Sequence, residues 1–360
     1  ERMSYRYQGR VQDILDAAVS SGEECGVQCI IRRGGETEAE CYSGSMDAAG
    51  TRKVTPESVF PVFSTGKCLF STLALKMIEK GAIGLDTPLG EVWPGFRTGA
   101  LRPKVTMRHV LTHTTGMHIM PPLASAEELS DWDLVCDRMA EMEPLWEPGT
   151  RTQYQAITYA WLLGGSLVHA TGRSMLDLMT KEILEPCGIT NDTFFSLPEK
   201  EEARLGDIVR GDDLLPNVEI HETFMNPLDN AMKLRCVRQA CIPSFACISN
   251  ARGIAKFGEA LADGRIISHE MIREATKLQR PKDEPIPSYD QDVYWSVFGY
   301  GYILLGNYPN LGELFGHHGW GGSELSINQR TGTVFAIVKN KLSGKVNQRM
   351  KMEIHKLADE

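Results

Sequence analysis

Ser64 and Lys67, in the segment Ser64-Thr65-Gly66-Lys67, form the first pair in the chain whose types and spacing could do chemistry. A serine hydroxyl is a weak nucleophile until a base beside it accepts its proton. Residues three apart on a helix share a face, so the Lys67 amine could reach that hydroxyl, and a lysine that burial keeps neutral could be the base. The segment therefore predicts nucleophilic catalysis by serine. The alternative, a helix cap followed by a surface lysine, stays open.

Tyr154 and the stretch from Gly316 to Ser323 are two further candidates. Tyr154 stands just before a helix predicted over 159–170, where its phenol could point into a cleft and carry a proton. The glycines around His317 and Trp320 would let a substrate approach the backbone, whose N–H groups could complete an oxyanion hole. The alternatives are an ordinary tyrosine at an interface and a tight turn with a packed histidine.

Hydrophobic periodicity predicts the elements that must position these residues. An extended stretch over 59–63 leads into an apolar helix over 64–80, which places Ser64 at a buried strand-to-helix junction. The other main predicted helices cover 9–21, 159–170 and 345–358, and the predicted strands cover 26–35, 36–43, 300–305, 323–328 and 333–339.

The predicted strands lie at both ends of the chain, and most of the helical sequence lies between them. Because the late strands are joined by short hairpins rather than by crossover helices, they should pair antiparallel. We therefore expect an α/β fold of the α+β type, with one antiparallel sheet built from both chain termini and flanked by helices. Residues 1–360 would form one catalytic unit, in which 1–63 and about 250–360 make the α/β lobe and about 64–249 an inserted, mainly helical lobe.

The composition is that of an ordinary globular protein and excludes several classes. A net charge of −9 and the lack of any basic run argue against binding to nucleic acid. No stretch approaches the ~18 apolar residues of a membrane helix and no N-terminal leader pattern is present, so no membrane span is expected. The nine cysteines form no Cys-x-x-Cys pair and the histidines no His-Glu-x-x-His spacing, so we expect no metal and no cofactor. Scattered cysteines favour a reducing compartment and hence a cytoplasmic location.

Segments in chain order resemble the serine β-lactamase and penicillin-binding-protein superfamily, most of all its class C-like branch of esterases, transesterases and D-amino-acid peptidases. Ser64 and Lys67 match its Ser-x-x-Lys element, Tyr154 begins its Tyr-x-Asn element, and His317-His318-Gly319 matches its Lys/His-x-Gly element. Between and around them lie further family-like stretches at 80–89, 111–117, 146–154 and 248–257. The resemblance covers roughly 10–342, nearly the whole chain.

This resemblance implies a role for each matching residue. Ser64 would be the acylated nucleophile, Lys67 its base, and Tyr154 the group that carries a proton to the leaving group and activates the acceptor. The backbone N–H groups of Ser64 and Trp320 would form the oxyanion hole. The cleft around this hole would include His317 and Gly319. The reaction implied is acyl transfer in two steps through an acyl-enzyme.

Tyr154-Gln155-Ala156 departs from the Tyr-x-Asn element. The family asparagine binds the substrate's amide carbonyl and helps to position the lysine, and an Ala156 side chain can do neither. Gln155 stands one place away and would reach a substrate only if the loop is remodelled. His317 replaces the lysine that, in true β-lactamases, helps to bind the substrate carboxylate. These departures favour an ester or thioester whose acyl group is largely apolar.

We expect substrate contacts from Gln155, Trp146 and His318, and a hydrophobic pocket with contributions from Trp132, Trp146, Trp295 and Trp320. The alternative is that the tryptophans are core residues, which we favour for Trp132 and Trp295.

The leading functional hypothesis is a serine esterase or acyltransferase acting on a hydrophobic small molecule, for example in specialised metabolism. The substrate would be a small-molecule ester or thioester, and an acyl carrier is included among the candidate donors. Two alternatives stay open: a β-lactam or D-amino-acid amide hydrolase, and an inactive scaffold or binding protein, for which Ala156 is the argument. Hydrolysis and transfer are not separated, because they differ only in which acceptor reaches the acyl-enzyme.

Overall fold

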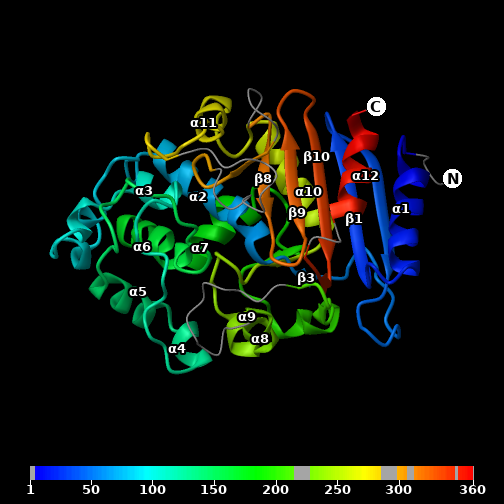
Figure 1. Cartoon of the computed structure of the whole chain (residues 1–360), viewed down its shortest axis with the longest axis horizontal. Coiled ribbons are helices and arrows are strands. Elements are labelled where there is room, and N and C mark those ends of the chain that lie inside the picture. Colours follow the sequence, from blue (N-terminus) through cyan, green and yellow to red (C-terminus); the bar gives the residue numbers. More distant parts are fainter. Residues whose placement is uncertain (1–4, 215–227, 285–297, 306–311, 345–347, 360) are drawn as a thin grey trace.

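A six-stranded antiparallel sheet forms one side of the computed structural model, which describes residues 5–214, 228–284, 298–305, 312–344 and 348–359 (Figure 1). Its strand order is β2-β1-β10-β9-β8-β7. The N-terminal hairpin of β1 (Gly26–Arg33) and β2 (Glu36–Gly44) joins the late strands through the pairing of β1 with β10 (Thr333–Lys339). This confirms the predicted sheet, built antiparallel from both ends of the chain.

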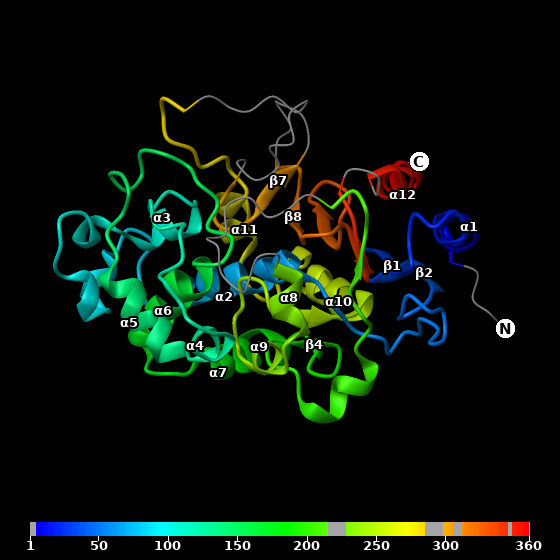
Figure 2. The same ribbon diagram turned by 60° about the horizontal axis from the view of Figure 1, so that its bottom comes forward.

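The two faces of this sheet are covered by different helices. Side chains alternate along a strand, so Val27, Cys29 and Ile31 of β1 face one side and Ile30 the other. The first three pack with α1 (Gln8–Ser20) and α12 (Gln348–Asp359), and Ile30 belongs to the main core, on the side of α10 (Ala251–Ala262). Figure 2 shows α1 and α12 together on one side of the sheet and α10 on the other.

Helix α2 (Lys67–Glu79) lies at the centre of the molecule. Almost all its side chains from Lys67 to Met77 are buried, because it packs against β8 of the sheet and against α6 and α7 of the helical part. A helix that is apolar on all sides needs such surroundings. It therefore ties the sheet to the helices, with its first turn directed at the site described below.

The other helices and strands of the described chain complete the fold. The helices are α3 (Met107–Leu111), α4 (Ala126–Ser130), α5 (Trp132–Glu141), α6 (Tyr159–Thr171), α7 (Met175–Met179), α8 (Leu228–Lys233), α9 (Arg235–Gln239) and α11 (His269–Ala275). The strands are β3 (Phe60–Pro61), β4 (Thr193–Phe194), β5 (Val209–Arg210), β6 (Ile248–Ser249), β7 (Ile303–Leu305), β8 (Leu314–His318), β9 (Glu324–Asn328) and β11 (Lys341–Leu342). None of the described helices is long and apolar enough to cross a membrane.

Two local predictions are corrected by the structure. Residues 314–318 form strand β8, whereas the sequence indicated only a Gly-rich edge there, because a five-residue strand with a glycine and two histidines has little β propensity. Ser64 is not the first residue of the long helix, since a 3₁₀ turn over Phe63–Gly66 precedes α2. The division into two lobes stays a prediction.

Candidate active site

The nucleophile candidate lies on a constrained turn between β3 and α2. Strand β3 pairs with β6, and the N–H of Val62 donates to the carbonyl of Cys247 at 2.9 Å. Phe63 then adopts a left-handed conformation with φ 48°. This conformation is energetically unfavourable for any residue other than glycine, and it occurs often at functional sites. Gly66 allows the turn to pass close to β6, because a Cβ there would lie 2.4 Å from the Cβ of Cys247. The turn presents Ser64, which is 7% exposed.

Lys67 is held beside Ser64 by three oxygen atoms. Its Nζ lies 3.0 Å from Oγ of Ser64, 2.8 Å from the carbonyl oxygen of Ala156 and 2.6 Å from the carbonyl oxygen of Ser244. Carbonyl oxygens can only accept, so they take two N–H groups of the lysine. A neutral amine has only those two, and its lone pair is then left to face the Ser64 hydroxyl. The geometry is that of a base directed at a nucleophile.

Burial favours this neutral form of Lys67. The side chain is fully buried and, among the described residues, forms no ion pair. Desolvation of the ammonium therefore holds the pKa of Lys67 well below its ordinary value of 10.5. The backbone carbonyl of Ala156 also corrects the expectation that Ala156 cannot help to position the lysine: the residue does so without a side chain.

Tyr154 stands over this pair on the loop before α6. Its ring centroid lies 5.0 Å from Nζ of Lys67, and its ring stacks on Phe298 with a centroid separation of 5.7 Å. Burial raises the pKa of Tyr154 above its usual 10.0, and the Ser64 hydroxyl, which hydrogen-bonds the phenol, only partly opposes this. Tyr154 is therefore a neutral phenol, able to donate a proton near Ser64.

The end of β8 approaches the nucleophile turn from the other side. A Cβ on Gly319 would lie 2.1 Å from the carbonyl oxygen of Val62, so only glycine permits this approach. The next residue, Trp320, packs edge to face with Phe63, with ring centroids 5.6 Å apart. In the described part of the chain, neither the N–H of Ser64 nor that of Trp320 donates to another backbone group. These two free donors are the predicted oxyanion hole, and its assignment stays a proposal.

His317 contributes a hydrogen-bond acceptor to the site. Its Nδ1 lies 2.8 Å from the carbonyl oxygen of His318, so Nδ1 must carry the proton and Nε2 the lone pair. Nε2 is buried and has no hydrogen-bond partner among the described residues. Burial holds the pKa of His317 well below 6.5, so this side chain is neutral. It supplies no positive charge for a substrate carboxylate.

Two residues expected to contact substrate lie elsewhere. The side-chain amide of Gln155 is fully buried and bonded to the carbonyl of Val110, at 3.0 Å, and to the hydroxyl of Thr115. His318 faces the opposite side of the sheet from His317, because neighbouring strand residues alternate. It lies 4.0 Å from Glu324, which in turn bonds His355 of α12 at 2.7 Å. Neither prediction fits these positions.

The tryptophans divide between surface and core. Trp146 is partly buried. Its ring stacks on that of His118, with centroids 5.4 Å apart, and the guanidinium carbon of Arg151 lies 4.8 Å from its ring centroid. Trp132 packs on Trp161 at 6.0 Å, as expected of a core residue. Trp295 lies outside the described residues.

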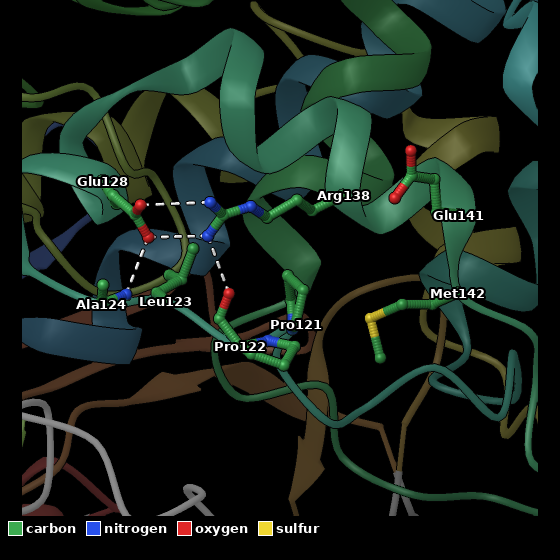
Figure 3. A pocket seen from close by; sticks show the side chains of 8 residues that line it. All are labelled: Pro121, Pro122, Leu123, Ala124, Glu128, Arg138, Glu141 and Met142. Carbon is green, nitrogen blue, oxygen red and sulfur yellow. Dashed lines mark hydrogen bonds and ion pairs between the residues drawn. The ribbon is translucent and has the colours of Figure 1, made fainter.

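Two cavities lie in the helical part of the molecule. Figure 3 shows the larger, of about 600 Å³, beside a loop that Arg138 holds by donating to the carbonyl of Pro122 at 2.8 Å and by pairing with Glu128 at 2.6 Å. The second, of about 340 Å³, is lined by Trp132, Met175 and Cys241 among others. Neither of the two is lined by Ser64, Lys67 or Tyr154.

His113 is the residue near this site that the sequence reasoning left without a role. It is buried, has φ 57° and packs its ring 5.0 Å from that of Tyr154. The one available signal was its position in the family-like stretch 111–117, which says nothing about its distance from Tyr154.

Comparison with known proteins places the chain among others of this architecture. Residues 11–359 match the family described as Beta-lactamase. The chain is 26% identical over 331 residues to Esterase/beta-lactamase LipL from Mycobacterium tuberculosis, an alignment that covers 86% of this chain and 75% of that protein. A family VIII carboxylesterase superposes with a TM-score of 0.82 at 24% identity, covering 99% of both chains. A penicillin-binding protein homologue from Caulobacter crescentus gives a TM-score of 0.82 at 26% identity, covering 96% of this chain and 95% of that one.

Proposed function

The chain belongs to the beta-lactamase family, and from that premise we propose that it is a serine esterase that acts on uncharged carboxylic esters through an acyl-enzyme on Ser64. The observation that carries the proposal is the environment of Lys67. Both N–H groups of a neutral Lys67 are taken by the carbonyls of Ala156 and Ser244, at 2.8 and 2.6 Å, and its lone pair faces Ser64. An inactive scaffold has no need of this arrangement.

Acylation begins with transfer of the Ser64 hydroxyl proton to Nζ of Lys67. Oγ attacks the ester carbonyl carbon, and the N–H groups of Ser64 and Trp320 bind the oxygen that becomes negative. As the bond to the alcohol breaks, the Tyr154 hydroxyl gives the alcohol oxygen a proton and recovers one from Lys67. Water or another hydroxyl then attacks the acyl-enzyme by the same steps in reverse.

Three observations support an uncharged, largely apolar ester as the substrate. The neutral imidazole of His317 offers an acceptor where a carboxylate would need a cation. The relative LipL is named an esterase/beta-lactamase, so the ester chemistry has a precedent at 26% identity. The apolar rings of Tyr154, Phe298 and Trp320 around the site suit an apolar acyl or alcohol group. Thioesters, including those on an acyl carrier, are attacked in the same way and belong to the proposal.

The test compares turnover of p-nitrophenyl acetate, butyrate and octanoate with that of a chromogenic cephalosporin and a D-alanyl p-nitroanilide. Ser64→Ala serves as the control for hydrolysis that does not involve the site. We expect the esters to be turned over fastest, and no turnover by Ser64→Ala. A cephalosporin or an anilide hydrolysed faster than every ester would replace the ester proposal with the amide alternative.

A further inference from the structure

We propose that His113 is the positioning residue for Tyr154: it binds the backbone on both sides of the tyrosine and thereby sets the phenol over Ser64. The inference rests on the proposed function, because it assigns a role within the same site.

Both residues that flank Tyr154 donate a backbone hydrogen bond to His113. The N–H of Gln153 donates to the carbonyl oxygen of His113 at 2.8 Å, and the N–H of Gln155 donates to its Nδ1 at 3.2 Å. The side chain and the backbone carbonyl of His113 therefore fix the chain on both sides of Tyr154. Since Nδ1 accepts, the imidazole is the neutral tautomer with its proton on Nε2.

The left-handed backbone of His113 makes this double contact possible. Its φ is 57°, a conformation in which histidine is more frequent than most residues but which still costs energy in a buried position. The residues just before His113 are also fixed by hydrogen bonds. Gly301 N–H donates to the carbonyl of Leu111 at 2.8 Å, and the Gln155 side chain donates to the carbonyl of Val110 at 3.0 Å. Several hydrogen bonds to residues 110–113 therefore stabilise the strained conformation of His113.

The imidazole ring also packs beneath the phenol. Its centroid lies 5.0 Å from that of Tyr154, 4.3 Å from that of Phe298 and 4.9 Å from that of Tyr159. Phe298 contacts both rings, because it also stacks nearly parallel on the tyrosine at 5.7 Å. Backbone and ring contacts together leave the phenol little freedom to turn away from Ser64. A misplacement of about 1 Å at a reacting group can cost about 100-fold in rate.

The experiment compares His113→Asn with His113→Gly, each made in the parent and in Tyr154→Phe. Asparagine and glycine both tolerate positive φ, but only asparagine keeps a side-chain acceptor for the Gln155 N–H. The matched control is His169→Asn, because His169 also packs on an aromatic ring, that of Trp93 at 5.0 Å, and its Nδ1 also hydrogen-bonds the backbone, at the carbonyl of Gly165, 2.8 Å away. The readouts are kcat and KM for p-nitrophenyl acetate, and the rate of fluorophosphonate labelling by intact mass.

We expect His113→Gly to lower kcat and the labelling rate by about 100-fold with KM nearly unchanged, and His113→Asn to lose less than about 10-fold. In Tyr154→Phe, His113→Gly should cost less than about 3-fold more, because the group it positions is gone. Equal losses in the two backgrounds, or no rescue by asparagine, would overturn the proposal. Because labelling is measured separately, a parent that is labelled but hydrolyses no ester would refute the ester function and leave His113 to be judged by the labelling rates.

Discussion

The carbonyl oxygen of Ala156 lies 2.8 Å from Nζ of Lys67. Residue 156 is the position at which this chain lacks the asparagine of the Tyr-x-Asn element, and the side chain lost there is one that would help to orient the lysine. The backbone carbonyl contacts Nζ without it, together with the carbonyl of Ser244. The loss of the asparagine therefore removes an amide that would bind substrate but leaves the proposed base in place, which is consistent with the proposal of esters rather than amides as substrates.

Replacing Lys67 should abolish turnover without unfolding the protein. Lys67→Arg introduces a guanidinium that stays protonated and provides no neutral base, and we expect kcat/KM for p-nitrophenyl acetate to fall by about 10³-fold. Circular dichroism checks the fold of the variant. If Lys67→Arg retains more than a tenth of the parent activity, another group must be the base.

The acid side of the pH profile should report the deprotonation of Lys67. Activity needs the neutral amine, so kcat/KM should rise with pH as Lys67 loses its proton. Because burial lowers the pKa of Lys67, the rise should be complete well below pH 10.5. The pKa of Tyr154 is raised, so the alkaline fall from ionisation of the phenol should begin only above pH 10. A rise centred near 10.5 would contradict the assignment of Lys67.

Tyr154→Phe should lower kcat by about 10²- to 10⁴-fold, with KM little changed, because the phenol moves protons in the transition states and does not bind the substrate in the ground state. The control is Tyr159→Phe, which removes a buried phenol bonded to Ser71 at 2.7 Å. We expect that variant to keep most of the activity. Near-normal rates for Tyr154→Phe would remove the tyrosine from the mechanism.

The neighbouring histidines of β8 allow a test of substrate charge. His317→Lys places an amine beside the site, and the ratio of cephalosporin to ester turnover should rise about 10-fold or more, because a carboxylate would gain a cation. His318→Lys places the same side chain on the opposite face, 4.0 Å from Glu324 in the parent, and should leave the ratio unchanged. A ratio that His317→Lys does not move would show that the histidine does not select against carboxylates.

Gly319→Ala should impair catalysis through the backbone. Its Cβ would lie 2.1 Å from the carbonyl oxygen of Val62, so the end of β8, with the Trp320 N–H, must move away from Ser64. We expect kcat to fall by about 10²-fold, the loss typical of one missing oxyanion-hole donor. Gly9→Ala, in α1, meets no atom within 4 Å and is the neutral control.

Local spacing was enough to predict the parts of the site that local structure determines. Ser64 and Lys67 are three residues apart at the start of a helix, so their proximity follows from helix geometry. The antiparallel sheet followed from hairpin lengths at the two ends of the chain. Such features need no knowledge of long-range contacts.

The errors concern contacts that only the tertiary structure decides. His317 and His318 are adjacent, and the register of β8 with β9, which pairs His317 with Leu325 and His318 with Glu324, determines which of them faces the site. Gln155 is buried because Val110 and Thr115 bond its amide, residues far away in the sequence. The role proposed for His113 depends on a left-handed backbone conformation that is uncommon for residues other than glycine, and on a contact with Tyr154 that the stretch 111–117 did not reveal.

The most direct test of the central claim is the intact mass of the protein after reaction with a fluorophosphonate. The parent should gain the mass of one phosphonyl group, at Ser64, and Ser64→Ala should gain none. A parent that takes no label, or a Ser64→Ala variant that is labelled as fast as the parent, would contradict the assignment of Ser64 as the nucleophile.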